Sequence, residues 1–206
     1  MNQYIYIMKK TIKSIIAVLA LTFIAGIANA QDQESGKKVQ TFTVSRTMPV
    51  PVDKVWAHIA DDFGGIAKAH PGLAASSLLE GSEDCGEGCE RVCYLNEKET
   101  KYTKEVMTNY DKDSYSFDAN IFALEGIPMD ESVSVGHYAL HQIDDNTTTL
   151  VFTMDYRTKP AFMGALAKGK LESTIGDYLL AVEHYLTTGE QVNKDNFKEI
   201  KKQYKD

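Results

Sequence analysis

The stretch PAFMGALAKGKLESTIGDYLLAVEHYLTTG, residues 160–189, predicts one long amphipathic helix near the C-terminus. Its apolar side chains recur at steps of three and four residues, which keeps one face apolar. They are Phe162, Met163, Leu166, Leu171, Ile175, Tyr178, Leu179, Val182 and Leu186. Pro160 suits the start of a helix, and Gly189 suits the position just after its end. Because an isolated helix is marginally stable in water, the apolar face must pack against a partner.

The segments before this helix predict that the partner is an antiparallel sheet. Residues 40–48 alternate as a first strand, residues 52–62 form a short amphipathic helix, and residues 66–70 add one helical turn. Six further strands follow, separated by short polar turns, at 74–81, 89–97, 102–110, 114–121, 132–143 and 148–158. The order is therefore one strand, two short helices, six strands and the long helix, an α+β arrangement with seven strands.

The first thirty residues have the features of a secretory signal peptide. Three lysines precede an apolar run at 15–27, and the sequence Ala-Asn-Ala at 28–30 supplies a small-residue cleavage site. The run is shorter than the roughly 20 apolar residues of a membrane-spanning helix. We therefore expect cleavage after Ala30, no membrane span afterwards, and a periplasmic or secreted protein, with Met8 as an alternative start.

The rest of the chain divides into three parts. Residues 31–39 are polar and form a linker, residues 40–189 carry the predicted domain, and residues 190–206 form a charged tail. The 176 residues after the cleavage site suit one domain with a sizeable core. Within the tail, apolar residues at 197, 200 and 204 have helical spacing. A frayed end is the simplest interpretation, with a docked helix or a partner-binding segment as alternatives.

The net charge argues against partners that are themselves negatively charged. The full chain has a formal charge of −7, and loss of the three signal-peptide lysines makes it −10. Such a surface repels nucleic acid and anionic lipid headgroups. We expect neither a nucleic-acid partner nor a cofactor, since the sequence has no phosphate loop, dinucleotide fingerprint, Gly-x-Ser-x-Gly elbow or His-Glu-x-x-His motif.

The three cysteines lie close together in a chain that is expected to be exported. A glycine on either side of Glu87 predicts a turn that places Cys85 opposite Cys89, so these two residues are predicted to form a disulfide. Cys93 lies four residues further along the same strand, roughly 13 Å away at about 3.3 Å per residue, and stays free. No histidine lies nearby in the sequence, so we expect no zinc site.

Five short segments occur in an order that points to a known family. They are VPVDKVW at 50–56, FGGI at 63–66, HPG at 70–72, GEGCER at 86–91, and a strand that ends in Tyr110-Asp111. In this order they resemble the START/Bet v 1-like superfamily, also called SRPBCC, and in particular its polyketide cyclase/dehydrase-like members. The resemblance covers about residues 40–188.

This resemblance implies a helix-grip fold, in which a curved antiparallel sheet wraps around the C-terminal helix and encloses a hydrophobic cavity. Many relatives bind lipids, sterols, hormones or polyketides in that cavity. Relatives often have an aromatic residue near the position of His70, so the edge of the site is expected to be more polar here. The cysteine hairpin is not a general feature of the family.

Strand alternation gives candidate apolar residues for the cavity wall. Phe152, Met154 and Tyr156 share one face of the last strand, and Tyr115 and Phe117 share the corresponding face of residues 114–121. These faces should turn toward the long helix, which would add Phe162 and Leu166. Ordinary core packing is the alternative for each of them.

Candidate polar residues come from the third, fourth and sixth strands and from one loop. Arg91 and Glu105 would form a ligand-positioning ion pair if their faces turn inward, and a surface pair worth little if they turn outward. Of the five histidines, His70 is the best candidate for a general base and His137 the next. Each of these histidines has a solvated or packed role as its alternative, and Tyr102 is a further candidate beside Glu105.

The sequence thus leaves two main functions open. The leading one is an exported binding protein that encloses a small hydrophobic ligand, lipid, sterol or polyketide-like, with Arg91, Glu105 or His70 giving orientation. The alternative is a cyclase/dehydratase-type enzyme in which His70, Glu105 or Tyr102 enolises a carbonyl substrate. A third is an interaction module that uses the acidic surface and the tail. The apolar loop at 122–129 would either gate the cavity or pack against residues 64–70.

Overall fold

Seven strands with alternating inward and outward side chains form one antiparallel sheet in the computed structural model, which describes residues 38–82 and 85–205. The strands are β1 (Gln40–Met48), β2 (Ala75–Leu78), β3 (Glu90–Tyr94), β4 (Tyr102–Asp111), β5 (Ser116–Glu125), β6 (Val135–Asp144) and β7 (Thr147–Tyr156). Their order across the sheet is β1-β7-β6-β5-β4-β3-β2. The N-terminal strand therefore pairs with the last one. The expected signal peptide and residues 31–37 of the expected linker lie outside the described residues.

The helical elements are α2 (Val52–Trp56), α3 (Gly164–Thr188) and α4 (Phe197–Gln203), together with short irregular turns. α2 runs into a π-helical turn, η1 (Ala57–Asp61), and a 3₁₀ turn, η2 (Phe63–Lys68); two more 3₁₀ turns are η3 (Glu131–Val133) and η4 (Ala161–Met163). The predicted element order and the α+β class are confirmed. The second and third strands are shorter than predicted, and β5 extends through the first half of the predicted loop at 122–129.

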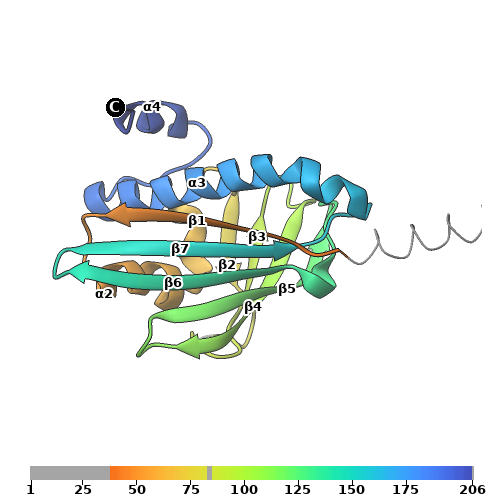
Figure 1. Ribbon diagram of the computed structural model, residues 1–206, viewed down its shortest axis with the longest axis horizontal. Helices are drawn as coiled ribbons and strands as arrows, with labels where there is room; N and C mark the ends of the chain where they lie inside the picture. Colours follow the sequence, from red (N-terminus) through yellow and green to blue (C-terminus); the bar gives the residue numbers. More distant parts are fainter. Residues whose placement is uncertain (1–37, 83–84, 206) are drawn as a thin grey trace, which may run out of the picture. The chain divides into compact units, whose positions relative to one another are not determined.

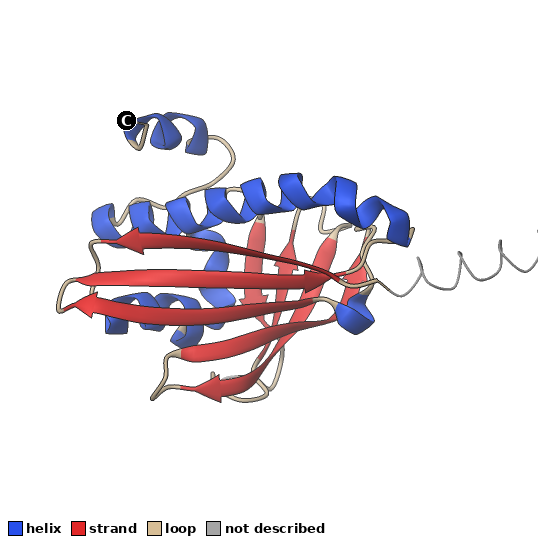
Figure 2. Cartoon of the chain, viewed as in Figure 1, coloured by secondary structure: helices blue, strands red, loops and turns tan. Residues whose placement is uncertain are grey.

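α3 lies against the sheet and runs along β1, as Figures 1 and 2 show. It ends where predicted, because Gly189 adopts a left-handed conformation with φ of 79° and its N–H donates to the Tyr185 carbonyl at 2.8 Å. This is the usual glycine termination of a helix. None of the helices in the described residues is long and apolar enough to cross a membrane.

The core fills one end of the space between α3 and the sheet. Trp56 of α2 is fully buried and packs edge-on against Phe117 of β5, while Leu179 and Val182 contribute from the C-terminal half of α3. The N-terminal half of α3 is different, since Leu166 there is 75% exposed. The sheet side of that half is held at Gly164, whose carbonyl accepts from Tyr156, and the space beneath α3 lies between this point and the core, beside Ile175.

The C-terminal tail is a docked helix, not the frayed end expected from its composition. Ile200 of α4 and the preceding Val192 are buried against Leu180 and Ala181 on α3. The Val192 N–H also donates to the Lys68 carbonyl at 2.9 Å. The free energy gained by burying these apolar side chains holds the segment on α3, although most residues around them are charged.

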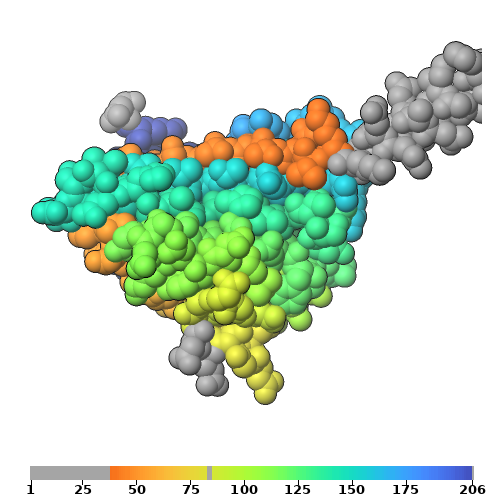
Figure 3. Space-filling model, turned by 60° about the horizontal axis from the view of Figure 1, so that its bottom comes forward, coloured from red at the N-terminus to blue at the C-terminus, as the bar shows by residue number. Residues whose placement is uncertain are grey.

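None of the described helices covers the outer face of the sheet over strands β1, β7, β6 and β5. Figure 3 shows these strands side by side, from β1 in orange through the teal strands to β5 in green. Polar side chains from neighbouring strands pair across this face, as Thr43 and Thr153 do at 2.8 Å. Residues with side chains on this face belong to the surface and not to the space beneath α3.

Candidate functional site

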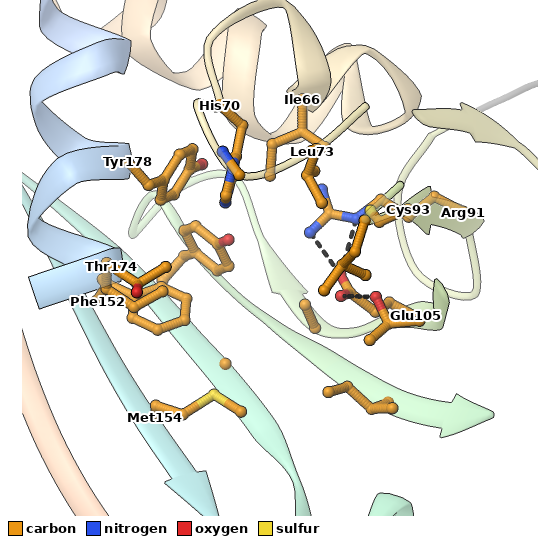
Figure 4. Close-up of a pocket in the computed structure, with 18 residues that line it drawn as sticks. Ile66, His70, Leu73, Arg91, Cys93, Glu105, Phe152, Met154, Thr174 and Tyr178 are labelled. Carbon is orange, nitrogen blue, oxygen red and sulfur yellow. Dashed lines mark hydrogen bonds and ion pairs between the residues drawn. The ribbon is translucent and has the colours of Figure 1, made fainter. Parts of the chain in front are cut away.

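A cavity of about 220 Å³ lies between α3 and the inner face of the sheet (Figure 4). Its lining is mainly apolar and comes from the loop after η2, from five strands and from α3. The residues are Ile66, His70, Gly72, Leu73, Arg91, Cys93, Leu95, Thr103, Glu105, Ala119, Ile121, Gly136, Tyr138, Phe152, Met154, Thr174, Ile175 and Tyr178. Gly72, Leu95 and Thr174 are exposed, so the cavity opens between α3, the η2–β2 loop and the end of β3.

An ion pair between Arg91 and Glu105 forms the polar part of the wall. The two residues are direct cross-strand partners on β3 and β4. Both Nε and Nη2 of Arg91 donate to Oε2 of Glu105, at 2.8 and 2.6 Å. Arg91 is 2% exposed, and the inward arrangement is thus the one that the structure adopts (Figure 4).

The surroundings of this pair hold both side chains in place. Arg91 Nη1 donates to the Phe63 carbonyl at 3.1 Å, and its guanidinium lies 3.8 Å from the centre of the Phe63 ring. Thr103 donates its hydroxyl to the second carboxylate oxygen of Glu105 at 2.9 Å. Three of the five N–H groups of an arginine are used in these bonds, so two remain for a ligand.

His70 presents a hydrogen-bond donor to the cavity. Its Nδ1 accepts from the Gly72 N–H at 3.0 Å, which places the proton of the neutral ring on Nε2. The ring stacks on Tyr178 with a centroid separation of 4.9 Å. Burial, together with the nearby charge of Arg91, lowers the pKa of His70 to about 4. At neutral pH the imidazole is therefore uncharged and has no free lone pair.

Tyr178 carries a hydroxyl that lacks a partner in the described structure. The residue is 1% exposed and lines the cavity from α3. Its Oη is buried and makes no hydrogen bond of normal geometry to a described residue, although the Tyr138 hydroxyl is near enough to affect its pKa. Burial raises the pKa of Tyr178 well above its usual value, so the group stays protonated. An unsatisfied buried hydroxyl costs about 1–3 kcal/mol, which a ligand acceptor could recover.

The cysteines occupy the places expected for them. Cys85 and Cys89 form a disulfide, and Cys93 is free and buried in the cavity wall. Burial, with the neighbouring carboxylate of Glu105, raises the pKa of Cys93 to about 12. The thiol is therefore protonated and weakly nucleophilic at neutral pH.

Gly136 of β6 makes room for an aromatic ring in the wall. A Cβ at this position would lie 2.9 Å from Cε2 and Cζ of Phe152, which is two residues along β7 from Met154, the pairing partner of Gly136. Both residues line the cavity. The absence of a side chain at 136 thus allows the Phe152 ring to lie over the sheet.

Five of the residues predicted for the site line the cavity, namely His70, Arg91, Glu105, Phe152 and Met154. Three others on the inner side pack elsewhere. Phe117 stacks on Tyr138 at 4.6 Å within the core, Tyr115 donates its hydroxyl to Asp53 at 2.5 Å beside α2, and Tyr156 donates to the Gly164 carbonyl at 2.7 Å.

The remaining predicted residues lie outside the cavity. His137 is on the outer face, where its Nδ1 is 2.6 Å from Asp118. Tyr102 also turns outward, against Tyr94 at 6.4 Å between ring centres. Phe162 and Leu166 are exposed by 68% and 75%. The first turn of α3 meets the sheet through Gly164, whose carbonyl accepts from Tyr156, and Leu166 lies on the opposite side of the helix. These four side chains do not contribute to the cavity wall.

Sequence reasoning missed three residues that matter most for the polar end of the site. Tyr138 alternates with Gly136 and Leu140 on the inner face of β6. The opposite face, which carries His137, is equally apolar, so the sequence does not show which of the two faces turns inward. Tyr178 was recognised as part of the helix face but not as a cavity donor. Thr174 lies on the same helix at the opening and has no apolar signal. No cluster of three or more His, Cys, Asp or Glu side chains suited to a metal occurs in residues 38–82 and 85–205.

A long helix held against a curved antiparallel sheet, with an apolar cavity between them, defines a helix-grip protein. The family model described as "Polyketide cyclase / dehydrase and lipid transport" matches residues 39–183. The chain belongs to this family, which confirms the resemblance to SRPBCC proteins. A comparison with curated proteins gives no significant match.

Solved structures agree on the fold. Ara h 8.0201 is 20% identical, with a TM-score of 0.58 over 73% of this chain and 99% of that one. The protein XoxI from Bacillus cereus is 15% identical, with a TM-score of 0.59 over 72% and 96%. A protein from Thermobifida fusca is 19% identical, with a TM-score of 0.59 over 74% and 96%. The helix-grip fold is therefore established, while the ligand is not indicated at these identities.

Proposed function

We propose that this protein is an exported binding protein that encloses a small hydrophobic molecule, such as a lipid, a sterol or a polyketide-like compound, in the cavity beneath α3. The observation that carries this proposal is an apolar cavity of about 220 Å³ whose polar wall offers hydrogen-bond donors. These are the Tyr178 hydroxyl, Nε2 of His70 and the spare N–H groups of Arg91. A ligand with a carbonyl, carboxyl or hydroxyl oxygen at its buried end would satisfy them.

The state of the candidate bases favours binding over catalysis. Enolisation of a carbonyl substrate requires a free lone pair within reach of the substrate. Nδ1 of His70 is occupied by the Gly72 N–H, and Glu105 accepts three hydrogen bonds, two from Arg91 at Oε2 and one from Thr103 at Oε1. The cyclase alternative, for which the family description is the support, would have to use the remaining lone pair on Oε1 of Glu105, a carboxylate whose charge Arg91 already neutralises.

Export is supported by the signal-like segment at residues 1–30 and by the Cys85–Cys89 disulfide, since disulfides persist in oxidising compartments. The intact mass of protein recovered from the periplasm or the medium should correspond to a chain that starts at Gln31. A full-length mass in the cytoplasmic fraction would contradict export.

Ligand binding is tested first by mass spectrometry of small molecules extracted from the purified protein and by titration with the apolar fluorophore N-phenyl-1-naphthylamine. Thr174→Trp places an indole at the exposed rim of the opening, so we expect at least a tenfold loss of affinity for the fluorophore. Ser173→Trp is the matched control, because Ser173 is exposed on the same turn and does not line the cavity. Equal affinities for both variants and the unmodified protein would contradict binding in this cavity.

The enzyme alternative is tested on whatever molecule is extracted. An enzyme should convert it in a mass-spectrometric time course, and Glu105→Gln or His70→Gln should stop conversion while binding persists. A binding protein should return the molecule unchanged, and the same two variants should weaken its retention.

A further inference from the structure

A second cavity of about 290 Å³ adjoins the first one on the side of the C-terminal segment. We call it the outer chamber. It is lined by Pro71, Gly72, Leu73, Ala74, Leu95, Asn96, Glu97, Asn193, Lys194 and Asp195. Gly72, Leu73 and Leu95 also line the cavity beneath α3. The two spaces therefore meet at these three residues, at the opening of the inner cavity.

The C-terminal segment that builds the outer chamber is held firmly against the domain. Val192 bridges to Ala69 and its N–H donates to the Lys68 carbonyl at 2.9 Å. Next along the chain, Lys194 pairs with Glu97 beyond the end of β3. The wall therefore has a defined position beside the η2–β2 loop that carries His70.

Side-chain hydrogen bonds fix the turn that faces the chamber. The Asn193 side-chain oxygen accepts from the Asp195 N–H at 2.9 Å, and the Asn196 side-chain oxygen accepts from the Asn193 N–H at 2.9 Å. This turn lies beyond residues 39–183, the part matched by the family model. Three of the ten residues that line the outer chamber, 193–195, therefore lie outside the part of the chain that the family model matches.

The chemistry of the outer chamber contrasts with that of the inner cavity. Its side chains include two carboxylates, of Glu97 and Asp195, and one ammonium group, of Lys194. Glu97 and Lys194 neutralise one another, whereas the Asp195 carboxylate has no hydrogen bond or ion pair within the described part of the chain. The excess charge is negative, which attracts cationic groups and hydrogen-bond donors and repels phosphate, sulfate and carboxylate.

The inner cavity is also small for a complete ligand. Its volume of about 220 Å³ lies below the roughly 300–1,000 Å³ of pockets that enclose drug-sized molecules. A molecule whose apolar part fills this space would continue through the opening, past Leu73 and Leu95, into the outer chamber.

We propose that the outer chamber binds the head group of an amphiphile whose apolar part occupies the inner cavity. The head group is positively charged or uncharged and donates hydrogen bonds, as an ammonium or a hydroxyl group does. Asp195 is its principal acceptor, with Leu73 and Leu95 around the neck between the two spaces. This assignment rests on the proposed function and names the class of ligand.

Two probes with the same apolar chain and opposite charges test the head-group assignment. Octylammonium and octanoate are titrated into the full chain at neutral pH, below their aggregation concentrations, by isothermal calorimetry. Because octanoate can also enter with its carboxylate toward Arg91, the test is the effect of Asp195→Asn on each probe, and octanoate should not lose affinity in this variant. Octylammonium should lose affinity. Asp195→Asn should reduce its affinity about fivefold, the factor expected for loss of one charge pair at about 4 Å in water.

Two further variants make the result specific to the chamber. Lys194→Ala removes the positive group and should increase the preference for octylammonium. Asp145→Asn removes a carboxylate from the exposed β6–β7 turn, which lines neither space, and should leave both affinities unchanged. Thermal unfolding of each variant verifies that the fold is retained.

The outcomes separate this inference from the proposed function. An octylammonium affinity that Asp195→Asn leaves unchanged would overturn the outer chamber as a head-group site. In that case, if Thr174→Trp still weakens binding of N-phenyl-1-naphthylamine, the inner cavity would remain supported as a ligand-binding site. If neither the two probes nor the fluorophore binds, the proposed function and this inference are both overturned.

Discussion

At the scale of single residues, Tyr178 links folding to binding. Its ring is part of the core and stacks on His70, while its hydroxyl is buried without a partner among the described residues. Such a group lowers stability in the empty protein and improves binding of any ligand that supplies an acceptor. The same atom thus has opposite effects on the two properties.

Tyr178→Phe should therefore change stability and binding in opposite directions. Removal of the hydroxyl is expected to stabilise the empty protein by up to about 1 kcal/mol, because no hydrogen bond is lost and a desolvation cost disappears. Affinity for an extracted ligand with a carbonyl or carboxyl oxygen should fall about fivefold, the equivalent of about 1 kcal/mol. Urea denaturation and calorimetry measure the two effects. A destabilised variant with unchanged affinity would show that the hydroxyl has a structural partner.

His58 predicts how stability depends on pH. Burial is the main cause that lowers its pKa to about 4, and its Nε2 has no partner in the described structure. The unfolded chain takes up this proton below about pH 6.5, whereas the folded chain resists it until about pH 4. The free energy of unfolding should consequently fall as pH decreases from about 6.5 to 4, by at most about 3 kcal/mol from this group.

The variant His58→Phe should reduce the loss of stability between about pH 6.5 and pH 4. Phenylalanine keeps an aromatic ring beside Tyr185 but has no group that takes up a proton. Chemical denaturation at a series of pH values measures the slope. His141→Gln is the control, because His141 is exposed. A slope that His58→Phe leaves unchanged would assign the acid sensitivity to other groups.

At the scale of elements, β3 and β4 are joined by a buried ion pair as well as by backbone hydrogen bonds. Glu105→Leu would leave Arg91 buried and unpaired, which costs about 3–5 kcal/mol. The double variant Arg91→Met/Glu105→Leu replaces both charges with apolar groups and should recover most of that loss. Thermal unfolding of the single and double variants gives the comparison. A double variant no more stable than Glu105→Leu would mean that packing geometry, not charge, explains the effect.

The bounds of helices and strands include both the most accurate predictions from the sequence and the clearest errors. β1 begins and ends at the predicted residues, and Gly189 ends the long helix as expected. The inward side of β3 could not be decided, because Val92 on the opposite face is buried as well as Arg91. His137 was assigned to the wrong side for a similar reason, since both faces of β6 carry apolar residues.

The exposed start of the long helix has a different explanation. The predicted apolar face groups residues that a helix with about 100° per residue places on different sides. Leu166 lies on the side of α3 opposite Ile175, which lines the cavity, so Leu166 is exposed although it is apolar. Tyr178 lies on the same side as Ile175 and meets the cavity. The extent of the cavity depends on the curvature of the sheet, which no local pattern encodes.

At the scale of the whole molecule, the family fold is completed by a C-terminal segment that the family model does not cover. Ile200 is 2% exposed against α3, so Ile200→Ala should reduce the free energy of unfolding by about 2 kcal/mol. Lys198→Ala on the exposed side of the same helix should change it by less than about 0.5 kcal/mol. Thermal or urea unfolding distinguishes them. Equal stability of the two variants would mean that α4 is detached from the domain in solution.

Gly136 also has a consequence for how this protein and its relatives diverge. Since a single methyl group at that position would press on the Phe152 ring at 2.9 Å, exchange of glycine for alanine would move an aromatic wall of the cavity without touching the backbone hydrogen bonds of β6. One nucleotide substitution separates these two amino acids in the genetic code. One mutational step at this position would therefore alter the size of the molecule that this cavity accepts, before any change in the polar residues that recognise it.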